Sequence, residues 1–313
     1  MQLGMTNFSR VLIVLAALGG AAVAAPPAPA RPGAPIAAEL PAPAGPVVTL
    51  TSPGTGTRSP LRFAARRGTR STLTMSMKMA IGIEVGGNVV PPTPTPAIRM
   101  VMSVTVIGVD PAGDMTYEMK TRKVEALPGK GVTPEVLAST TAALAGMSEL
   151  AGRATVTSRG FARDVSLDVP ATATQQTRDM LGGMKQSLSQ LSAPLPEEPV
   201  GIGATWDTTT VLEQNGMRLT QIAHYTLLAR TRTRASLGVT IEQHALPQTI
   251  VANGLKLELV SYEGGGAGQT AFDLGMLVPR RSTVKVHSAL EMKMPGNDAL
   301  KMKLDLEMGM TGK

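Results

Sequence analysis

Residues 72–85 read TLTMSMKMAIGIEV, and this stretch decides the fold because every second side chain in it is apolar. The apolar positions include Met75, Met77 and Met79 and continue to Val85. Side chains two residues apart on a β-strand project from the same face, so this period predicts a strand with one apolar and one polar face. The apolar face of this strand is built largely from methionine.

The same alternation returns in four other segments, at residues 98–106, 115–119, 284–294 and 300–310. The last two flank the turn sequence PGND, which predicts a β-hairpin near the end of the chain. The chain is therefore predicted to be mainly β. Further strands are expected at residues 153–158, 161–169, 204–213, 217–231, 234–246, 255–263 and 269–277.

Two segments change to helical spacing, near residues 134–147 and 173–192. In the first segment, Thr133 can cap the helix and Pro134 suits its first turn. The sequence therefore predicts two helices beside the sheet. In the second segment, the apolar side chains that share one helical face are Met180, Leu181, Met184, Leu188 and Leu191.

The areas of these elements predict the architecture. About ten strands of ~12 residues make a face of roughly 1,900 Å², whereas two helices of ~18 residues cover only about 540 Å². Because the helices cannot bury the apolar face alone, the sheet is expected to curve over it. We therefore predict an α+β fold in one domain, residues 61–313: a strongly curved antiparallel sheet, or half-barrel, with two helices packed on its concave side.

The N-terminal residues have the pattern of an export signal. Arg10 precedes a short apolar run, and Ala-Val-Ala at residues 22–24 is the small-x-small pattern that signal peptidase reads. We expect a signal peptide at residues 1–24 and export to the periplasm, the cell surface or the extracellular space. Residues 25–60 are rich in Ala, Pro and Gly and are predicted to be a disordered linker. No later apolar run reaches the ~20 residues that span a bilayer, so the mature chain is not expected to span a membrane.

The chain is basic, with a formal net charge of +7 and short basic groups such as Arg230, Arg232 and Arg234. A nucleic-acid partner is not expected, because the aromatic residues that form stacking platforms for single strands make up only 3% of the chain. A basic exported protein suits anionic lipid headgroups or acidic polysaccharides better. An anionic surface of the cell envelope is therefore one candidate partner.

Catalytic and metal-binding patterns do not emerge from the sequence. His224, His244 and His287 stand singly in strand-like segments, and none has a partner at the spacing of a metal site. The glycine-rich residues 264–268 lack the Lys-Ser/Thr of a phosphate-binding loop and are predicted to be a flexible turn. We therefore predict no catalytic residue, no metal ligand and no cofactor, and a protein that is not an enzyme.

The methionine rows hold the candidate binding residues. The unbranched, polarisable methionine side chain fills irregular gaps in a core and also adapts to varied apolar ligands. Core packing is the plain interpretation, and a lining for a lipid or other hydrophobic small molecule is the more specific one. The predicted ligand-binding residues are Met75, Met77, Met79, Met100, Met102, Met292 and Met294.

Three hypotheses of function follow. The first is an exported, non-enzymatic protein that binds a lipid or another hydrophobic ligand in a Met-lined concavity of the sheet. The alternative is a structural or interaction module of the cell envelope that binds anionic surface polymers. The third is handling of Cu(I), a soft ion that thioether clusters suit, by the Met-x-Met rows.

Residues 195–206, LPEEPVGIGATW, hold the most distinctive local pattern. This stretch resembles the P-x-x-P-V-G-x-G-x-x-W signature of an uncharacterised family of secreted bacterial β-rich proteins, and the strands from Trp206 to about His244 are also similar to that family. The resemblance covers about half of the mature chain, and it implies no known activity and no functional residue. In outline, the predicted domain also resembles the periplasmic lipoprotein-carrier fold, without a shared motif.

Overall fold

The structure is a computed structural model, and it describes residues 45–313 apart from residues 93, 149, 169–193, 215, 253–254, 295 and 297–298. Among the described residues, α2 (Pro134–Leu144) is the one α-helix, and the 3-10 turn η1 (Ala145–Met147) continues it. No helix in this part of the chain is long and apolar enough to cross a membrane. The strands are β1 (Val47–Ser52), β2 (Thr55–Ser59), β3 (Arg70–Val85), β4 (Asn88–Val90), β5 (Ala97–Val109), β6 (Met115–Leu127), β7 (Ala151–Val156), β8 (Ala162–Asp168), β9 (Val200–Ile202), β10 (Thr205–Gln214), β11 (Met217–Arg230), β12 (Arg234–His244), β13 (Gln248–Ala252), β14 (Leu255–Asp273), β15 (Pro279–Lys293) and β16 (Ala299–Gly312).

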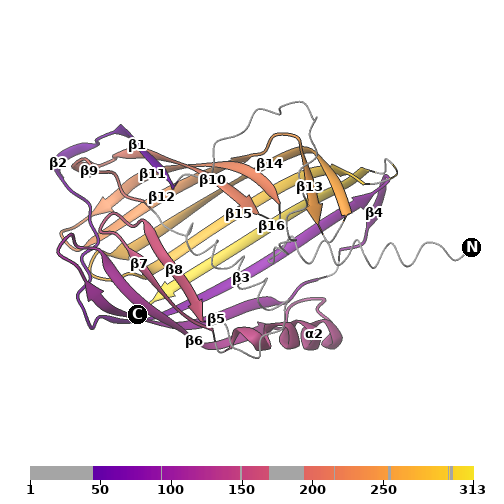
Figure 1. Cartoon of the computed structure of the whole chain (residues 1–313), viewed down its shortest axis with the longest axis horizontal. Helices are drawn as coiled ribbons and strands as arrows, with labels where there is room; N and C mark the ends of the chain where they lie inside the picture. The colour runs from indigo at the N-terminus through magenta and orange to yellow at the C-terminus, as the bar shows by residue number, and fades with distance from the viewer. Residues whose placement is uncertain are drawn as a thin grey trace, which may run out of the picture.

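Most strands join one large antiparallel sheet (Figure 1). Its fourteen strands follow the order β1-β10-β11-β12-β14-β15-β16-β3-β5-β6-β7-β8, with β4 attached to β3 and β13 to β14. The short strands β2 and β9 pair separately. The sheet is open rather than closed into a barrel, because β1 and β8 form its two edges. The predicted mainly β, antiparallel fold is confirmed.

The stretch at residues 72–85 forms most of β3, as its alternation predicts. In the sheet, Met77 of β3 lies opposite Met308 of β16 on one side and Ile98 of β5 on the other. The hairpin predicted near the end of the chain is confirmed as β15–β16, in which Val284 pairs with Met308. Because opposed residues of paired strands share a face, the alternation in each strand adds up to one apolar face across the sheet.

Residues 264–268 are not the flexible turn that the sequence predicts. They lie in the middle of β14, a single 19-residue strand that replaces the separate strands predicted at residues 255–263 and 269–277. A Cβ atom at Gly266 would lie 2.4 Å from the carbonyl oxygen of Lys285 on β15. Glycine is required here because the neighbouring backbone comes too close for a side chain. Glycines inside strands often mark such a close approach of another backbone.

Strand structure begins before Leu61, so the linker predicted at residues 25–60 is too long at its C-terminal end. β1 pairs with β10, and Leu50 lies opposite the fully buried Trp206. The β1 sequence VVTLTS alternates like the other strands, and its Val48 and Leu50 pack against the core around Trp206. This short alternating stretch is included in the predicted linker because prolines and glycines surround it. The predicted signal peptide and the start of the linker lie outside the described residues.

The first predicted helix is confirmed as α2 with η1. The hydroxyl oxygen of Thr133 accepts a hydrogen bond from the backbone N–H of Val136 at 3.4 Å and caps the helix. The helix lies beside β6 and buries none of its residues, so it covers little of the sheet (Figure 1). The described residues therefore do not show two helices packed on the sheet. The second predicted helix, at residues 173–192, lies outside them.

A connecting segment, residues 60–69, packs against both halves of the sheet. Leu61 is buried in a core cluster with residues of β10, β11, β12 and β14. Ala65 is buried in another cluster, with residues of β5 and β6. Phe63 packs against both clusters, and its N–H donates to the carbonyl oxygen of Ser158 at 2.8 Å. The segment therefore ties the two halves together at one end of the molecule.

Candidate functional site

Three adjacent strands bring methionines together on the apolar face of the sheet. Met75 of β3 lies opposite Met310 of β16 and Met100 of β5, and Met77 lies opposite Met308. Directly opposed residues in an antiparallel pair have Cβ atoms about 4.5–5.5 Å apart. We call these five residues the methionine patch.

Part of the methionine patch is accessible. Met75, Met77, Met308 and Met310 are half-buried, whereas Met100 is only 5% exposed. A half-buried thioether side chain touches the core on one side and can contact a bound molecule on the other. Core packing therefore describes the buried Met100, whereas the other four methionines are accessible enough to contact a ligand.

The methionines predicted as ligand-binding residues do not form one site. Met79 continues the row on β3 and is half-buried, while Met102 is buried opposite Leu73. Met292 is 1% exposed in a separate core cluster, against which Met294 packs. Through the strand pairing, Met292 lies about eight residues, or ~26 Å, along the sheet from Met77. Met292 and Met294 therefore belong to the packing of another region.

Sequence reasoning missed Met308 and Met310 as site residues, although both stand in the alternating stretch at residues 300–310. They reach the patch because the last strand pairs with the first long strand, where neighbours such as Ser76 and Gly309 are 233 positions apart in the chain. The methionine alternation was the only local signal, and it does not reveal a partner strand.

The face around the methionine patch is uncharged. In the neighbouring strands β12, β14, β15, β16, β3 and β5, the described residues that pair in register on this face are apolar or carry only hydroxyl or amide groups. Charged residues of these strands, such as Lys78, Lys285 and Glu307, project from the other face. A charged ligand would lose hydration here without gaining a partner, so the face favours an apolar one.

The apolar face continues from the methionine patch toward β14. Gly266 and Gly268 of β14 lie opposite Val286 and Val284 and add no side chain to the face. The resulting strip is smooth and apolar, which suits contact along the length of an elongated molecule. The half-buried apolar side chains of β15 and β16 next to the patch are Val284, Val286, Leu304 and Leu306.

Two tyrosines near this face stay protonated around neutral pH. Tyr225 stacks on Trp206 with ring centroids 5.5 Å apart, and burial raises the pKa of Tyr225 to about 12. Burial also raises the pKa of Tyr262, whose hydroxyl donates to Oε1 of Gln243 at 2.9 Å. Neither hydroxyl is suited to act as a general base near neutral pH.

Two histidines lie near carboxylates on the opposite face of the sheet: His224, and His244, whose Nε2 is 3.9 Å from Oε2 of Glu242. Nδ1 of His224 lies 2.7 Å from Oδ1 of Asp207, and Nε2 of His224 lies 3.9 Å from Oε1 of Glu242. The contact between His224 and Asp207 joins residues that are opposed on β10 and β11. The His224 side chain is 42% exposed, and the described residues hold no group of three or more His, Cys, Asp or Glu that could bind a metal ion. We interpret these pairs as surface contacts.

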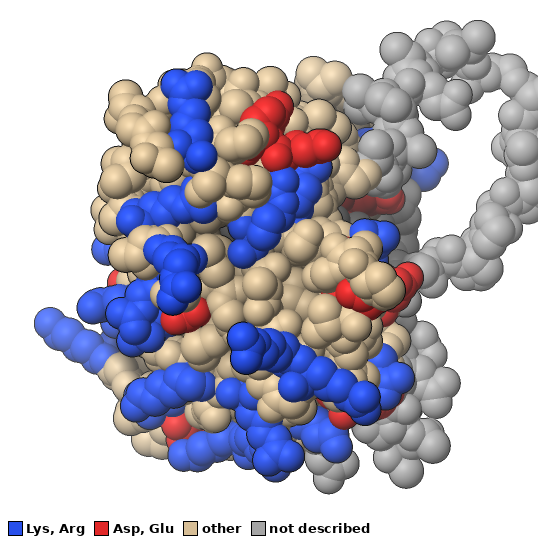
Figure 2. Space-filling model, turned by 90° about the vertical axis from the view of Figure 1, so that its left-hand side faces the viewer, with Lys and Arg blue, Asp and Glu red and all other residues tan. Residues whose placement is uncertain are grey.

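Lys and Arg side chains cover the end of the molecule where β2, β9 and the C-terminus lie (Figure 2). Of the arginines predicted to meet an anionic surface, Arg234 pairs with Asp273 at 3.7 Å, and Arg230 donates to the carbonyl oxygen of Ser59 at 2.7 Å. Arg232 makes no hydrogen bond or ion pair with the part of the chain that the structure describes. Of these three arginines, Arg230 and Arg234 therefore bind other groups of the protein, whereas the guanidinium of Arg232 can contact a ligand.

No protein-family model matches the chain, and no curated protein sequence matches it. The support for any function therefore comes from the geometry of the apolar face and of the basic end.

Proposed function

We propose that the protein binds an elongated apolar ligand, such as the acyl chain of a lipid, along the uncharged face of its sheet. The observation that carries this proposal is the methionine patch, in which half-buried thioether side chains of β3 and β16 meet the buried Met100 of β5 on a face without charged residues. Methionine adapts to irregular apolar partners. In this proposal the sheet curves around the ligand as a half-barrel, and the protein is a non-enzymatic binder.

Burial energies set the kind of ligand that this face can hold. Each methylene group transferred from water to the face contributes about 0.8 kcal/mol, while association costs about 4–15 kcal/mol in lost freedom of motion. Chains with fewer than about five methylenes therefore should not bind, and each added methylene should tighten binding about fourfold. Such a dependence on chain length is the signature of binding through the apolar chain.

The uncharged apolar fluorophore N-phenyl-1-naphthylamine tests the proposal, because it cannot use the basic end of the molecule. We expect a saturable rise in fluorescence with protein purified without detergent, and displacement by primary alcohols that strengthens from octanol to dodecanol. Met77→Glu places a charge in the methionine patch and should weaken binding at least tenfold. Ser76→Glu is the matched control, because Ser76 is exposed on the opposite face of the same strand, opposite Arg99.

Two outcomes contradict the proposal: no saturable binding by the unchanged protein, or equal binding by Met77→Glu and the unchanged protein. Because a charge can also impair folding, the uncharged variant Met77→Gln is measured alongside, and we expect its binding to be several-fold weaker. Native mass spectrometry of the same preparation identifies any ligand that co-purifies.

The methionine patch also supports Cu(I) as a second candidate ligand. Five thioether side chains gathered across three strands provide the soft ligands that Cu(I) prefers. Competition with a chromogenic Cu(I) chelator should reveal a sub-micromolar site that disappears when Met75→Leu and Met77→Leu are combined. Absence of competition by the unchanged protein excludes copper and leaves the apolar-ligand proposal standing.

We also propose that the chain is exported and acts in the cell envelope or outside the cell. The export pattern in residues 1–24 supports this proposal. The basic end of the molecule suits the anionic surfaces of that compartment.

A further inference from the structure

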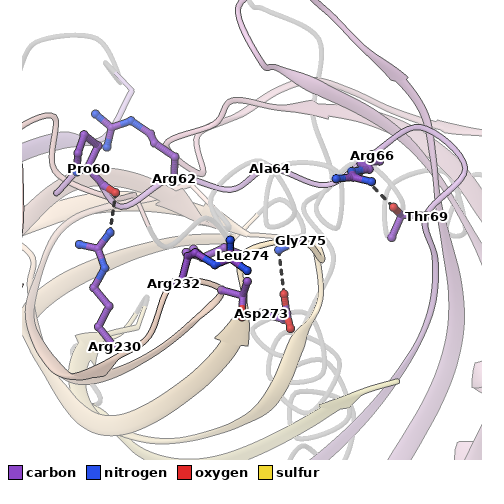
Figure 3. A pocket seen from close by; sticks show the side chains of 11 residues that line it. Pro60, Arg62, Ala64, Arg66, Thr69, Arg230, Arg232, Asp273, Leu274 and Gly275 are labelled. Carbon is purple, nitrogen blue, oxygen red and sulfur yellow. Dashed lines mark hydrogen bonds between the residues drawn. The ribbon is translucent and has the colours of Figure 1, made fainter.

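A cavity of about 410 Å³ lies at the basic end of the molecule (Figure 3). It is bounded by the connecting segment, the β11–β12 turn and the end of β14. Four arginines line it: Arg62 and Arg66 from the connecting segment, and Arg230 and Arg232 from the β11–β12 end. Among the described lining residues, Asp273 is the one carboxylate. Positive charge is therefore in excess around this cavity.

Two of the four arginines are held in place by backbone carbonyl groups. Arg62 donates to the carbonyl oxygen of Pro196 at 2.8 Å and to that of Glu197 at 2.7 Å. Arg230 donates to the carbonyl oxygen of Ser59 at 2.7 Å. A neutral carbonyl group orients a guanidinium without cancelling its charge. These two arginines therefore supply a fixed positive potential.

The pKa of Arg62 is lowered mainly by burial, and a positively charged neighbour outside the cavity lining adds to the shift. This neighbour is Arg159. Glu197 and Glu198 act in the opposite sense but do not reverse the shift. A bound anion would relieve this repulsion.

The other two arginines are available to a ligand. Arg66 and Arg232 make no side-chain hydrogen bond or ion pair within the described ranges. Asp273, by contrast, accepts a hydrogen bond from the N–H of Gly275 at 3.0 Å and pairs with Arg234 at 3.7 Å. Figure 3 shows Arg232 on the side of the cavity near Asp273 and Arg66 on the far side, near Thr69. The carboxylate is thus engaged, while two guanidinium groups remain free.

We propose that this cavity binds a phosphate group carried by a small molecule or by a lipid headgroup. A guanidinium matches two phosphate oxygens at once, and several such groups suit a multiply charged anion better than a single carboxylate. The hydroxyl groups of Thr69 and Thr233 also line the cavity and can donate to the remaining oxygens. Its volume is near the lower end of the range for ligand sites, about 300–1,000 Å³, and leaves room for a small organic group beside the phosphate. This site does not depend on the apolar-ligand proposal.

Isothermal titration calorimetry of the full chain with glycerol 3-phosphate at low ionic strength tests the proposal. We expect saturable binding of one equivalent, weakened about tenfold by Arg66→Gln or by Arg232→Gln and abolished by the two together. Both side chains are exposed, so neutral replacements should leave the fold intact. Arg67→Gln is the matched control, because Arg67 is exposed beside Arg66 but does not line the cavity.

Three results would overturn the proposal. The first is the absence of saturation, and the second is unchanged binding by the double variant. The third is an equal loss of affinity in Arg67→Gln and Arg66→Gln, which would show that net charge alone explains the effect.

Binding of glycerol 3-phosphate should also strengthen from about pH 5 to about pH 7, because a phosphate monoester gains its second negative charge near pH 6 while arginine stays charged. Binding of N-phenyl-1-naphthylamine should stay unchanged in the double variant.

Sedimentation with lipid vesicles distinguishes the two sources of the phosphate. A headgroup as ligand predicts binding to vesicles that contain phosphatidic acid, a lipid phosphate monoester, but not to phosphatidylcholine alone, with competition by glycerol 3-phosphate and loss in the double variant. A soluble phosphate ester as ligand predicts the same calorimetric titration without vesicle binding. Vesicle binding that persists in the double variant, without a calorimetric titration, contradicts a phosphate site in this cavity.

Discussion

Gly266 of β14 offers a sharp test of how closely the central strands approach each other. A Cβ atom added there would lie 2.4 Å from the carbonyl oxygen of Lys285 and 3.1 Å from Cα of Val286, both in the backbone of β15. The steric overlap of this Cβ atom with the backbone of β15 can be relieved only if β14 and β15 move apart. Separation weakens ladder hydrogen bonds of about 0.5–1.5 kcal/mol each, and overpacking adds about 1–3 kcal/mol. We therefore expect Gly266→Ala to lower the free energy of unfolding by about 2–5 kcal/mol.

The matched control is Gly265→Ala, one residue away on the other face of the same strand. Its Cβ atom would lie 3.3 Å from the carbonyl oxygen of Ile241 and 3.4 Å from the ring of His287, a side chain that can move. The exposed Ala267 shows that this face accepts a methyl group. We expect the free energy of unfolding to change by less than about 1 kcal/mol, since alanine also restricts the unfolded chain.

Urea unfolding followed by the fluorescence of Trp206 measures both variants. Trp206 is the only tryptophan in the chain and is fully buried, so its emission reports the loss of the core. Gly266→Ala should lower the urea midpoint with an unchanged slope, which indicates lower stability rather than a different unfolded state. Equal midpoints for the two variants would refute the close approach of β14 and β15.

Three further predictions concern the core, the pH dependence of stability and export. Trp206→Phe removes the indole N–H that donates to the carbonyl oxygen of Pro194 at 3.0 Å. The unpaired buried acceptor should lower the free energy of unfolding by about 1–3 kcal/mol. Because this variant has no tryptophan, its urea unfolding and that of the unchanged protein are followed by circular dichroism, and a loss below about 0.5 kcal/mol contradicts the prediction. Burial raises the pKa of Tyr225 to about 12, so the folded state keeps this proton at a pH where the unfolded chain, with a pKa near 10, has lost it. The stabilisation is complete below about pH 10, and up to about 3 kcal/mol is lost as the pH rises to about 12. Tyr225→Phe should remove this part of the alkaline loss in urea midpoints measured across that range. The predicted signal peptide requires the mature protein to begin at Ala25, and an intact mass that includes residues 1–24 contradicts it.

Features that depend on neighbours along the chain could be predicted from the sequence. The alternation at residues 72–85 predicts β3, and two alternating segments around a turn predict the hairpin β15–β16. Thr133 marks the start of α2, because a cap involves only the first turn of a helix. The apolar character of one sheet face also follows from period-two alternation, and with it the type of candidate ligand.

The tertiary structure alone decides which strands become neighbours and which side chains share a site. Met75 meets Met310 because the last strand pairs with the first long one, and Arg66 shares a cavity with Arg232 because the connecting segment crosses the β11–β12 end. Gly266 looks like part of a turn until β15 is seen to approach β14. Alternation is the same whatever partner a strand has, so contacts between residues far apart in the chain are set by the packing of the whole sheet rather than by any local pattern.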